Sequence, residues 1–226
     1  MKKFIPNWLL VWYRKNNSKF RNKSTNEVFS EIYNTNHWNS SESISGRGSE
    51  VEQTASLIND LDKLLSDIKI ASVLDIPCGD FNWMQKVDLS NIDYVGADIV
   101  EDLIMSNKRQ HKEWGNLKFK VLNLITDPLP KSDMIIVRDC LVHLSNEDIK
   151  SAIKNIKSSG SKYLLTTTFT NHSLNSDIVT GDWRHLNLQR KPFNFPSPIL
   201  TINENCTIGN GEYKDKSMAL WEISKV

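Results

Sequence analysis

Val73-Leu74-Asp75-Ile76-Pro77-Cys78-Gly79-Asp80 is the stretch of this 226-residue sequence that indicates the fold most directly. Residues 71–76 are mostly apolar, carry an acidic residue near their end, and are followed by a turn that contains glycine. Such a run is typical of a buried strand that leads into a loop. We therefore predict a strand over residues 71–76 and a ligand-binding turn over residues 75–80.

Helices and strands are predicted to alternate on both sides of this turn. Ser49-Glu50-Val51-Glu52 matches a capping box, and apolar residues then recur every three or four positions through residue 69, which predicts a helix. Further helices are predicted over residues 25–33, 81–87, 101–109 and 146–156, and strands over residues 94–98, 117–122, 134–138 and 163–168. Alternating strands and helices favour a doubly wound α/β fold, with a mostly parallel sheet and helices on both faces.

The composition is that of a single globular domain. Hydrophobic residues make up 39% of the chain and charged residues 24%, which argues against a disordered chain. The 28 basic and 27 acidic residues nearly cancel, so a nucleic-acid partner is not expected. Cys78, Cys140 and Cys206 are scattered, and no histidine pair has ligand spacing. We therefore expect a cytoplasmic protein without disulfides or a required metal.

Residues 1–23 form an N-terminal arm that differs from the rest of the chain. Its apolar run, residues 4–13, is too short to span a bilayer, which needs roughly 20 such residues. It also lacks the cleavage site of a signal peptide. Residues 16–23 are polar and basic and are predicted to be a linker. Two interpretations remain open: the arm packs on its own domain or on a second subunit, as in a homodimer, or it touches a membrane surface.

The turn over residues 75–80 predicts the kind of cofactor. Asp98 ends the next predicted strand 23 residues after Asp75, close to the spacing at which a carboxylate binds a ribose. A pyrophosphate would require the three glycines of G-x-G-x-x-G, and only Gly79 is present. Because Asp75 and Asp80 are acidic, the turn favours an adenosine cofactor that carries positive charge.

V-L-D-I-P-C-G-D resembles the first loop of class I S-adenosylmethionine-dependent methyltransferases, whose domain has a Rossmann-like, seven-stranded type of sheet. The resemblance covers roughly residues 49–168. It implies S-adenosyl-L-methionine as the cofactor, whose sulfonium and ammonium groups suit an acidic turn. The cofactor-binding residues that it and the loop indicate are Asp75, Pro77, Cys78, Gly79, Asp80, Asp98, Ile99, Asn123, Leu124 and Arg138.

The segment from Ile135 to Leu144 resembles the part of these enzymes that faces the transferable methyl group. His143 is a candidate general base, and Asp139, four residues earlier, would orient its imidazole if the chain turns helical there. The alternative is that His143 is structural. Asp139 and Arg138 are expected to line a pocket, because an unpaired charge in the core is costly.

Residues 180–188 are expected to cover the methyl acceptor. Trp183 could stack on a sugar ring, and Arg184 could bind a phosphate or carboxylate. The alternative is a surface loop with a buried tryptophan. The full set of candidate acceptor ligands is Trp38, Arg47, Trp183, Arg184 and Asn187. In this interpretation residues 24–226 form the methyltransferase domain, with the cofactor half over residues 49–168 and the acceptor side over residues 169–226.

E-S-I-S-G-R-G-S, from Glu42, and G-D-W-R-H-L-N-L, from Gly181, resemble a bacterial subgroup found among surface-polysaccharide genes. This resemblance implies O-methylation of a small polar acceptor, such as a sugar or sugar-phosphate group of a glycan precursor. N-methylation of a small molecule or protein is a second hypothesis. A third is a nucleotide-binding module without catalytic activity.

Overall fold

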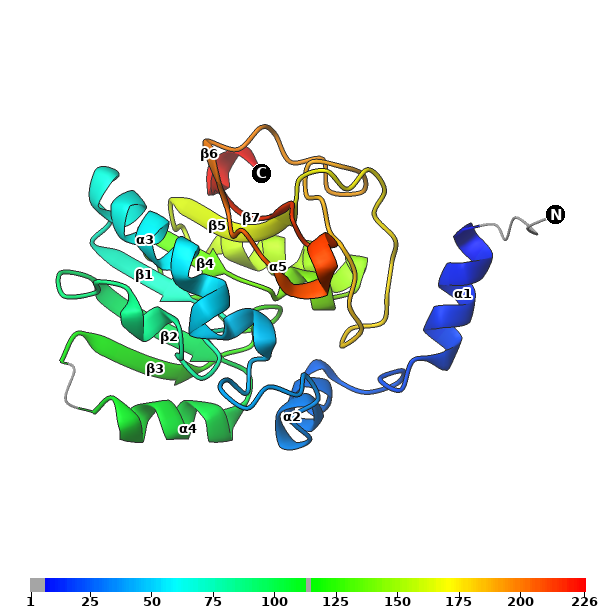
Figure 1. Ribbon diagram of the computed structural model, residues 1–226, viewed down its shortest axis with the longest axis horizontal. Coiled ribbons are helices and arrows are strands. Elements are labelled where there is room, and N and C mark those ends of the chain that lie inside the picture. Colours follow the sequence, from blue (N-terminus) through cyan, green and yellow to red (C-terminus); the bar gives the residue numbers. More distant parts are fainter. Residues whose placement is uncertain (1–6, 113–114) are drawn as a thin grey trace.

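The computed structural model describes residues 7–112 and 115–226, which include one seven-stranded sheet (Figure 1). The strands are β1 (Ser72–Asp75), β2 (Asp93–Asp98), β3 (Leu117–Val121), β4 (Met134–Val137), β5 (Tyr163–Phe169), β6 (Leu200–Asn203) and β7 (Lys216–Glu222). Their order is β3-β2-β1-β4-β5-β7-β6. The first five are parallel, and β7 runs antiparallel to both β5 and β6.

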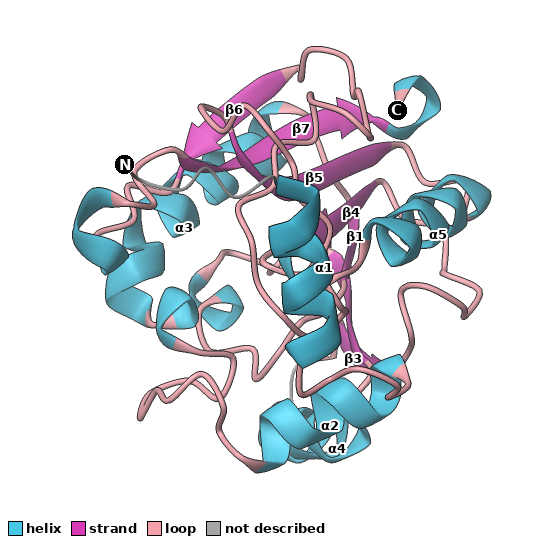
Figure 2. Ribbon diagram, turned by 90° about the vertical axis from the view of Figure 1, so that its right-hand side faces the viewer, coloured by secondary structure: helices cyan, strands magenta, loops and turns pink. Residues whose placement is uncertain are grey.

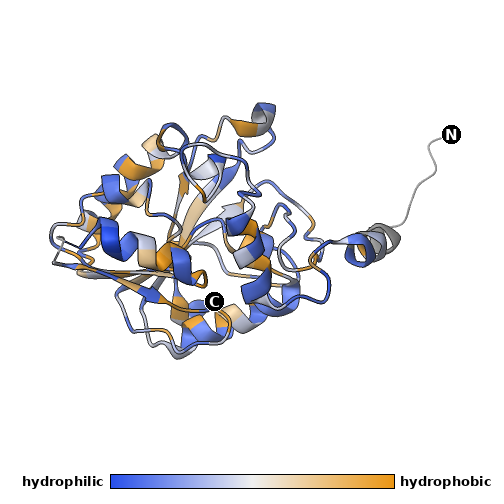
Figure 3. Ribbon diagram, turned by 90° about the horizontal axis from the view of Figure 1, so that it is seen from below, coloured by the Kyte–Doolittle hydropathy of each residue, from blue (hydrophilic) through white to orange (hydrophobic). Residues whose placement is uncertain are grey.

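Both faces of the sheet are buried, because neighbouring residues of each central strand enter different apolar clusters. In β1, Val73 belongs to the cluster that contains α3 (Val51–Asp67), and Leu74 belongs to the cluster that contains α5 (Asn146–Ser158). Figure 3 shows hydrophobic segments along the central strands and mostly hydrophilic loops around them. This arrangement confirms the predicted doubly wound, Rossmann-like α/β fold with helices on both faces.

Strand order places the predicted turn at a switch point. Strand β1 is flanked by β2 on one side and β4 on the other, so the connections after β1 and β4 leave the sheet in opposite directions. In open α/β sheets, ligands bind at the carboxyl ends of the strands at such a point. Helix α4 (Glu101–Gln110) follows β2 and packs against β2 and β3.

Two local predictions are wrong. The proposed capping box at Ser49 does not form, because the chain enters α3 through a 3-10 helix, η1 (Arg47–Ser49), and the amide of Val51 donates to Glu42 Oε1 instead. Residues 81–87 contain only a 3-10 helix, η2 (Met84–Lys86), since Phe81 has a φ of 59°, outside the helical region.

The N-terminal arm meets the body through α1 (Asn7–Asn17) and the turn that follows it. The predicted linker over residues 16–23 is not free, because Phe20 is buried against Val28 and Ile32 of α2 (Thr25–Asn34). Ser24 caps α2 through a complete capping box with Glu27. The first part of the apolar run, residues 4–6, lies outside the described residues. In the described ranges, no helix is long and apolar enough to cross a membrane.

Candidate active site

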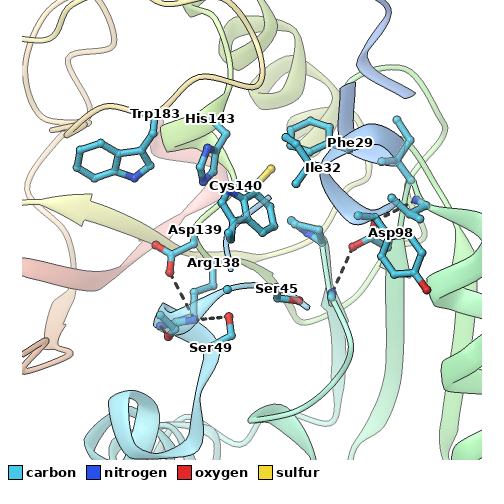
Figure 4. A pocket seen from close by; sticks show the side chains of 18 of the residues that line it. Phe29, Ile32, Ser45, Ser49, Asp98, Arg138, Asp139, Cys140, His143 and Trp183 are labelled. Atoms are coloured by element: carbon cyan, nitrogen blue, oxygen red, sulfur yellow. Dashed lines mark hydrogen bonds and ion pairs between the residues drawn. The ribbon is translucent and has the colours of Figure 1, made fainter. Parts of the chain in front are cut away.

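A cavity of about 730 Å³ opens at the carboxyl ends of β1, β2 and β4 (Figure 4). Its walls come from the turn after β1, the ends of β2 and β4, the segment after α1, and the loops before α3 and after β5. The structure brings most of the predicted site residues to this one cavity. They are Trp38, Arg47, Asp75, Pro77, Cys78, Gly79, Asp80, Asp98, Ile99, Asn123, Leu124, Arg138, Asp139, His143 and Trp183.

The end of β1 presents a buried carboxylate to the cavity. Asp75 is 2% exposed, and Oδ2 accepts a hydrogen bond of 2.6 Å from the Tyr94 hydroxyl. Burial raises the pKa of Asp75 from 3.8 to about 7, although the Tyr94 bond lowers it. Gly79, with a φ of 57°, turns the chain, and a Cβ there would lie 2.1 Å from Ser45 Oγ. The positive φ and the close approach of Ser45 both favour glycine at this position.

The end of β2 presents a second buried carboxylate. The amide of Gly79 donates to Asp98 Oδ2 at 3.2 Å, and the amide of Val100 donates to Oδ1 at 3.0 Å. Burial nevertheless raises the pKa of Asp98 from 3.8 to about 6. The hydrogen bond to Gly79 joins the ends of β1 and β2, so Asp98 both lines the cavity and shapes the turn.

Asp80 has contacts that the sequence did not predict. Its Oδ1 accepts hydrogen bonds from the hydroxyls of Ser43 and Ser45, and its Oδ2 accepts a bond of 2.9 Å from the amide of Ile44. The carboxylate therefore anchors the loop of residues 43–45 over the turn. Asp80 still lines the cavity, so its predicted contact with a cofactor stays a prediction.

The wall beyond β2 and β3 is mainly apolar. Ile99, Leu122 and Leu124 line it, together with the side chain of Asn123. Asn123 Oδ1 accepts from the amide of Ile125 at 2.9 Å, which fixes the side chain and leaves its amide nitrogen as a donor. An apolar slot with one amide donor suits an adenine ring.

Four charged side chains form a buried ion network beside the cavity. Arg138 Nη2 donates to Glu204 Oε2 at 2.5 Å, and Lys216 Nζ contacts Asp139 Oδ2 at 2.5 Å and Glu204 Oε2 at 3.2 Å. Burial lowers the pKa of Arg138, but the carboxylates of Glu204 and Asp139 outweigh it and raise the pKa above its usual value. Arg138 also donates to the carbonyl of Gly48, which ties β4 to the entry of α3.

Sequence reasoning missed Glu204 and Lys216. Glu204 follows β6 and Lys216 begins β7, and nothing near either residue in the sequence resembles a known motif. The only available signal was a lysine at the start of an otherwise apolar strand, K-S-M-A-L-W-E. A charged side chain buried at such a position is costly unless an oppositely charged group pairs with it.

Replacing Glu204 by glutamine is expected to lower the free energy of unfolding by about 2 kcal/mol, because Arg138 and Lys216 would keep only one carboxylate partner. Urea denaturation measures this loss, and Glu212→Gln, at an exposed position, is the matched control. A Glu204→Gln protein as stable as the control would contradict a stabilising role for the network.

His143 lies on the opposite wall and is held by backbone. Its Nδ1 lies 3.0 Å from the carbonyl oxygen of Asp182, and its ring lies 5.2 Å from the Trp38 ring. Burial lowers the pKa of His143 from 6.5 to about 4, so the imidazole is neutral near physiological pH. With the proton on Nδ1, Nε2 is an acceptor, and the described residues give it no hydrogen-bond partner.

The prediction that Asp139 orients His143 is wrong. The chain forms a 3-10 helix, η3 (Leu141–His143), after Asp139, which has a φ of 50°. The Asp139 carboxylate faces Lys216 and Arg138, both of which lower its pKa despite burial. The Asp182 carbonyl orients the imidazole instead.

An aromatic cluster borders the cavity next to His143. Trp183 is 40% exposed, and its ring meets those of Phe169, His185 and Tyr213 at centroid distances of 6.0, 4.7 and 5.3 Å. Figure 4 shows Trp183 and His143 side by side above Asp139. A partly exposed indole supported by other rings is a suitable platform for a flat or ring-shaped ligand.

Arg184 and Asn187 do not line the cavity, which corrects their predicted role as acceptor ligands. The Arg184 guanidinium is buried and donates to the carbonyls of Leu141 and Val142. The Asn187 amide donates to the carbonyls of Thr170 and His172. Both side chains thus donate hydrogen bonds to backbone carbonyls, and these bonds hold residues 170–188 in place.

The segment after α1 contributes wall residues that the sequence did not point to. They are Phe20, Phe29, Ile32 and Tyr33. Arg47 also lines the cavity, and the structure shows no carboxylate partner for it among the described residues. Within residues 7–112 and 115–226, no three His, Cys, Asp or Glu side chains are grouped to hold a metal ion.

Comparison with protein-family models and with curated protein sequences gives no match. Solved structures do match. The N-methyltransferase NodS from Bradyrhizobium japonicum WM9, in complex with S-adenosyl-L-homocysteine, is 14% identical, with a TM-score of 0.61 over 84% of this chain and 97% of that one. The methyltransferase domain of bacterial CtHen1-C is 14% identical, with a TM-score of 0.55 over 76% and 98%.

A third neighbour has a different activity. The [4+2]-cyclase SpnF is 13% identical, with a TM-score of 0.51 over 72% of this chain and 79% of that one. These likenesses show that the chain has the fold of class I methyltransferases. Because that fold also includes a cyclase, the reaction has to be argued from the site.

Proposed function

We propose that this chain is an S-adenosyl-L-methionine-dependent methyltransferase that methylates a hydroxyl group of a small polar acceptor. The observation that carries the proposal is the composition of one cavity. Two buried carboxylates, Asp75 and Asp98, form one side of it, and a neutral histidine beside an indole forms the other. One side suits a positively charged nucleoside cofactor, and the other suits an acceptor that carries a hydroxyl group.

The residues on the cofactor side fit S-adenosyl-L-methionine better than a nucleotide with phosphates. Phosphate groups need cations or a run of free amides. Of the two arginines and the buried lysine that line the cavity, Arg138 and Lys216 are already paired with carboxylates, which leaves Arg47 as the one without a described carboxylate partner. Two carboxylates, at the ends of β1 and β2, instead favour the ammonium and ribose groups of this cofactor. When bound, it would supply an activated methyl group for direct displacement.

On the acceptor side, His143 would receive a hydrogen bond at Nε2 from the acceptor hydroxyl and take its proton during transfer. The carbonyl of Asp182 fixes the tautomer that leaves Nε2 free. Trp38 and Trp183 would exclude water and hold the acceptor by stacking. The low pKa means that the imidazole is neutral throughout the neutral range, so Nε2 keeps a lone pair for the acceptor hydroxyl.

A sugar or sugar-phosphate group of a surface-glycan precursor is the acceptor class that we propose. Indole rings pack well on the apolar face of a sugar. Arg47 lines the cavity and has no described carboxylate partner. Its guanidinium would therefore bind an anionic group of the acceptor, such as a phosphate. N-methylation is the competing proposal, supported by the likeness to the N-methyltransferase NodS.

Cofactor affinity is expected to depend on pH. The pKa values of Asp75 and Asp98 are raised to about 7 and about 6, so both carboxyls take up protons as the pH falls, and a positively charged ligand must displace those protons. Affinity for S-adenosyl-L-methionine should be at least about 10-fold weaker at about pH 5.5 than at about pH 8. Calorimetric titration at both pH values measures this change. A dissociation constant that does not change would contradict the role of the two carboxylates.

The proposal as a whole is tested by incubating the protein with methyl-labelled S-adenosyl-L-methionine and a panel of nucleotide sugars, glycan precursors and amines. Label in a sugar fraction supports O-methylation of a glycan precursor. Label only in an amine would favour the competing proposal. Binding of the cofactor without label in any fraction would support a module without this activity.

A further inference from the structure

The N-terminal arm has a charge unlike that of the rest of the chain. Residues 1–23 contain seven of the 28 lysines and arginines and none of the 27 acidic residues. The other 21 basic residues share residues 24–226 with all the acidic ones, so the body has a net negative charge. Such a strong asymmetry indicates a surface that meets an anionic partner.

The arm also displays apolar side chains. Residues 8–13 of α1 have the sequence W-L-L-V-W-Y. Trp12 and Tyr13 are 59% and 62% exposed. Figure 1 shows α1 at the far side of the molecule from the sheet, and Figure 2, turned to that side, shows it in front. The body therefore does not cover Trp12 and Tyr13, two aromatic side chains of α1.

The base of the arm is fixed to the body. Lys15 Nζ contacts Asp177 Oδ2 at 2.6 Å, and Ser18 Oγ donates to Asp182 Oδ1 at 3.0 Å. Asp177 is itself held by the amides of Asn146 and Ile178. These contacts give α1 a defined starting direction, and they join the arm to the loop that carries Trp183.

We propose that the arm docks on the surface of a bilayer that contains anionic lipids. Tryptophan and tyrosine favour the membrane–water interface, and lysines and arginines beside them favour anionic headgroups. The arm combines both features within 23 residues. Docking would hold the cavity, whose wall includes Lys19 and Phe20, next to the bilayer.

A second copy of the chain is a poorer partner for the N-terminal arm than an anionic bilayer is. The large apolar side chains exposed on the described body are Met105 on α4, Val121 on β3, and Leu174, Trp183 and Ile199 in the connection between β5 and β6. No described helix of the body carries more than one of them, so none of these helices presents an exposed apolar stripe to α1. Pairing two arms with each other would bring together two segments that contain only positive charges.

Vesicle sedimentation tests the proposal with the full chain. The wild type is expected to bind vesicles of phosphatidylcholine and phosphatidylglycerol, to bind pure phosphatidylcholine at least about 10-fold more weakly, and to be released by about 0.5 M salt. Trp12→Ser/Tyr13→Ser should lose at least about 10-fold in affinity, as should Lys2→Gln/Lys3→Gln. The matched controls, Leu174→Ser/Ile199→Ser and Lys154→Gln/Lys157→Gln, alter exposed residues elsewhere and should bind like the wild type.

Two results would overturn the proposal. One is a wild type that binds neither kind of vesicle, or both kinds equally. The other, seen by light scattering, is a dimer that Trp12→Ser/Tyr13→Ser converts to a monomer while the wild type ignores anionic vesicles. Because neither readout involves methyl transfer, the proposal can fail or hold independently of the proposed enzymatic function.

Discussion

Replacing Asp98 by alanine is expected to weaken S-adenosyl-L-methionine binding by about 100-fold, since two charge-assisted hydrogen bonds to the ribose would be lost. Asp98 is 5% exposed at the end of β2 and lies in the cavity wall. Its carboxylate also accepts hydrogen bonds from the amides of Gly79 and Val100, so removing the carboxylate would also destabilise the turn after β1. Calorimetric titration of the variant measures the effect.

Asp93→Ala is the control for this experiment, because Asp93 is an exposed aspartate at the other end of the same strand. It should bind the cofactor like the wild type. Thermal unfolding of Asp98→Ala, and of the similarly sized Asp98→Asn, separates lost binding from lost folding. A folded Asp98 variant with a dissociation constant within about threefold of the wild type would contradict the assignment.

Replacing His143 by alanine is expected to lower kcat by about 100-fold or more and to leave cofactor affinity nearly unchanged, because a general base contributes to proton transfer and not to cofactor binding. The pKa of His143 is lowered to about 4, so the imidazole is already neutral. The wild-type kcat, measured with saturating cofactor, should therefore show no step near the usual histidine pKa of about 6.5.

His172→Ala is the matched control, since His172 lies in the connection after β5 and does not line the cavity. Partial rescue of His143→Ala by added imidazole would support proton abstraction. Near-normal turnover of His143→Ala on the identified acceptor would show that the residue is structural, and it would favour an amine acceptor, which needs less help from a base.

The cofactor side of the site could be predicted from sequence because its residues follow from local patterns. Asp75 and Asp98 end two strands, and parallel strands bring their carboxyl ends to one edge of the sheet. Asn123 and Leu124 were predicted from the resemblance of V-L-N-L to class I methyltransferases, and both line the cavity. No contact between distant segments had to be known for these assignments.

Other parts of the site depend on contacts between segments far apart in the chain. Glu204 and Lys216 reach Arg138 only because the antiparallel pair β6 and β7 extends the sheet beyond β5. The contacts of Asp80 were not predicted because its partners, residues 43–45, lie 35 to 37 positions earlier in the chain. Arg184 was misassigned because its donors are used by carbonyls of the segment after β4.

The most direct test of the proposed cofactor is calorimetric titration of the folded chain with S-adenosyl-L-methionine and S-adenosyl-L-homocysteine, with ATP and NADH as comparison ligands. We predict one site for each of the first two ligands, with a dissociation constant of about 100 μM or tighter, and no measurable binding of ATP or NADH. A folded protein that binds neither S-adenosyl compound, or that binds ATP or NADH more tightly, would contradict the proposal that this cavity is built for a methyl-donating cofactor.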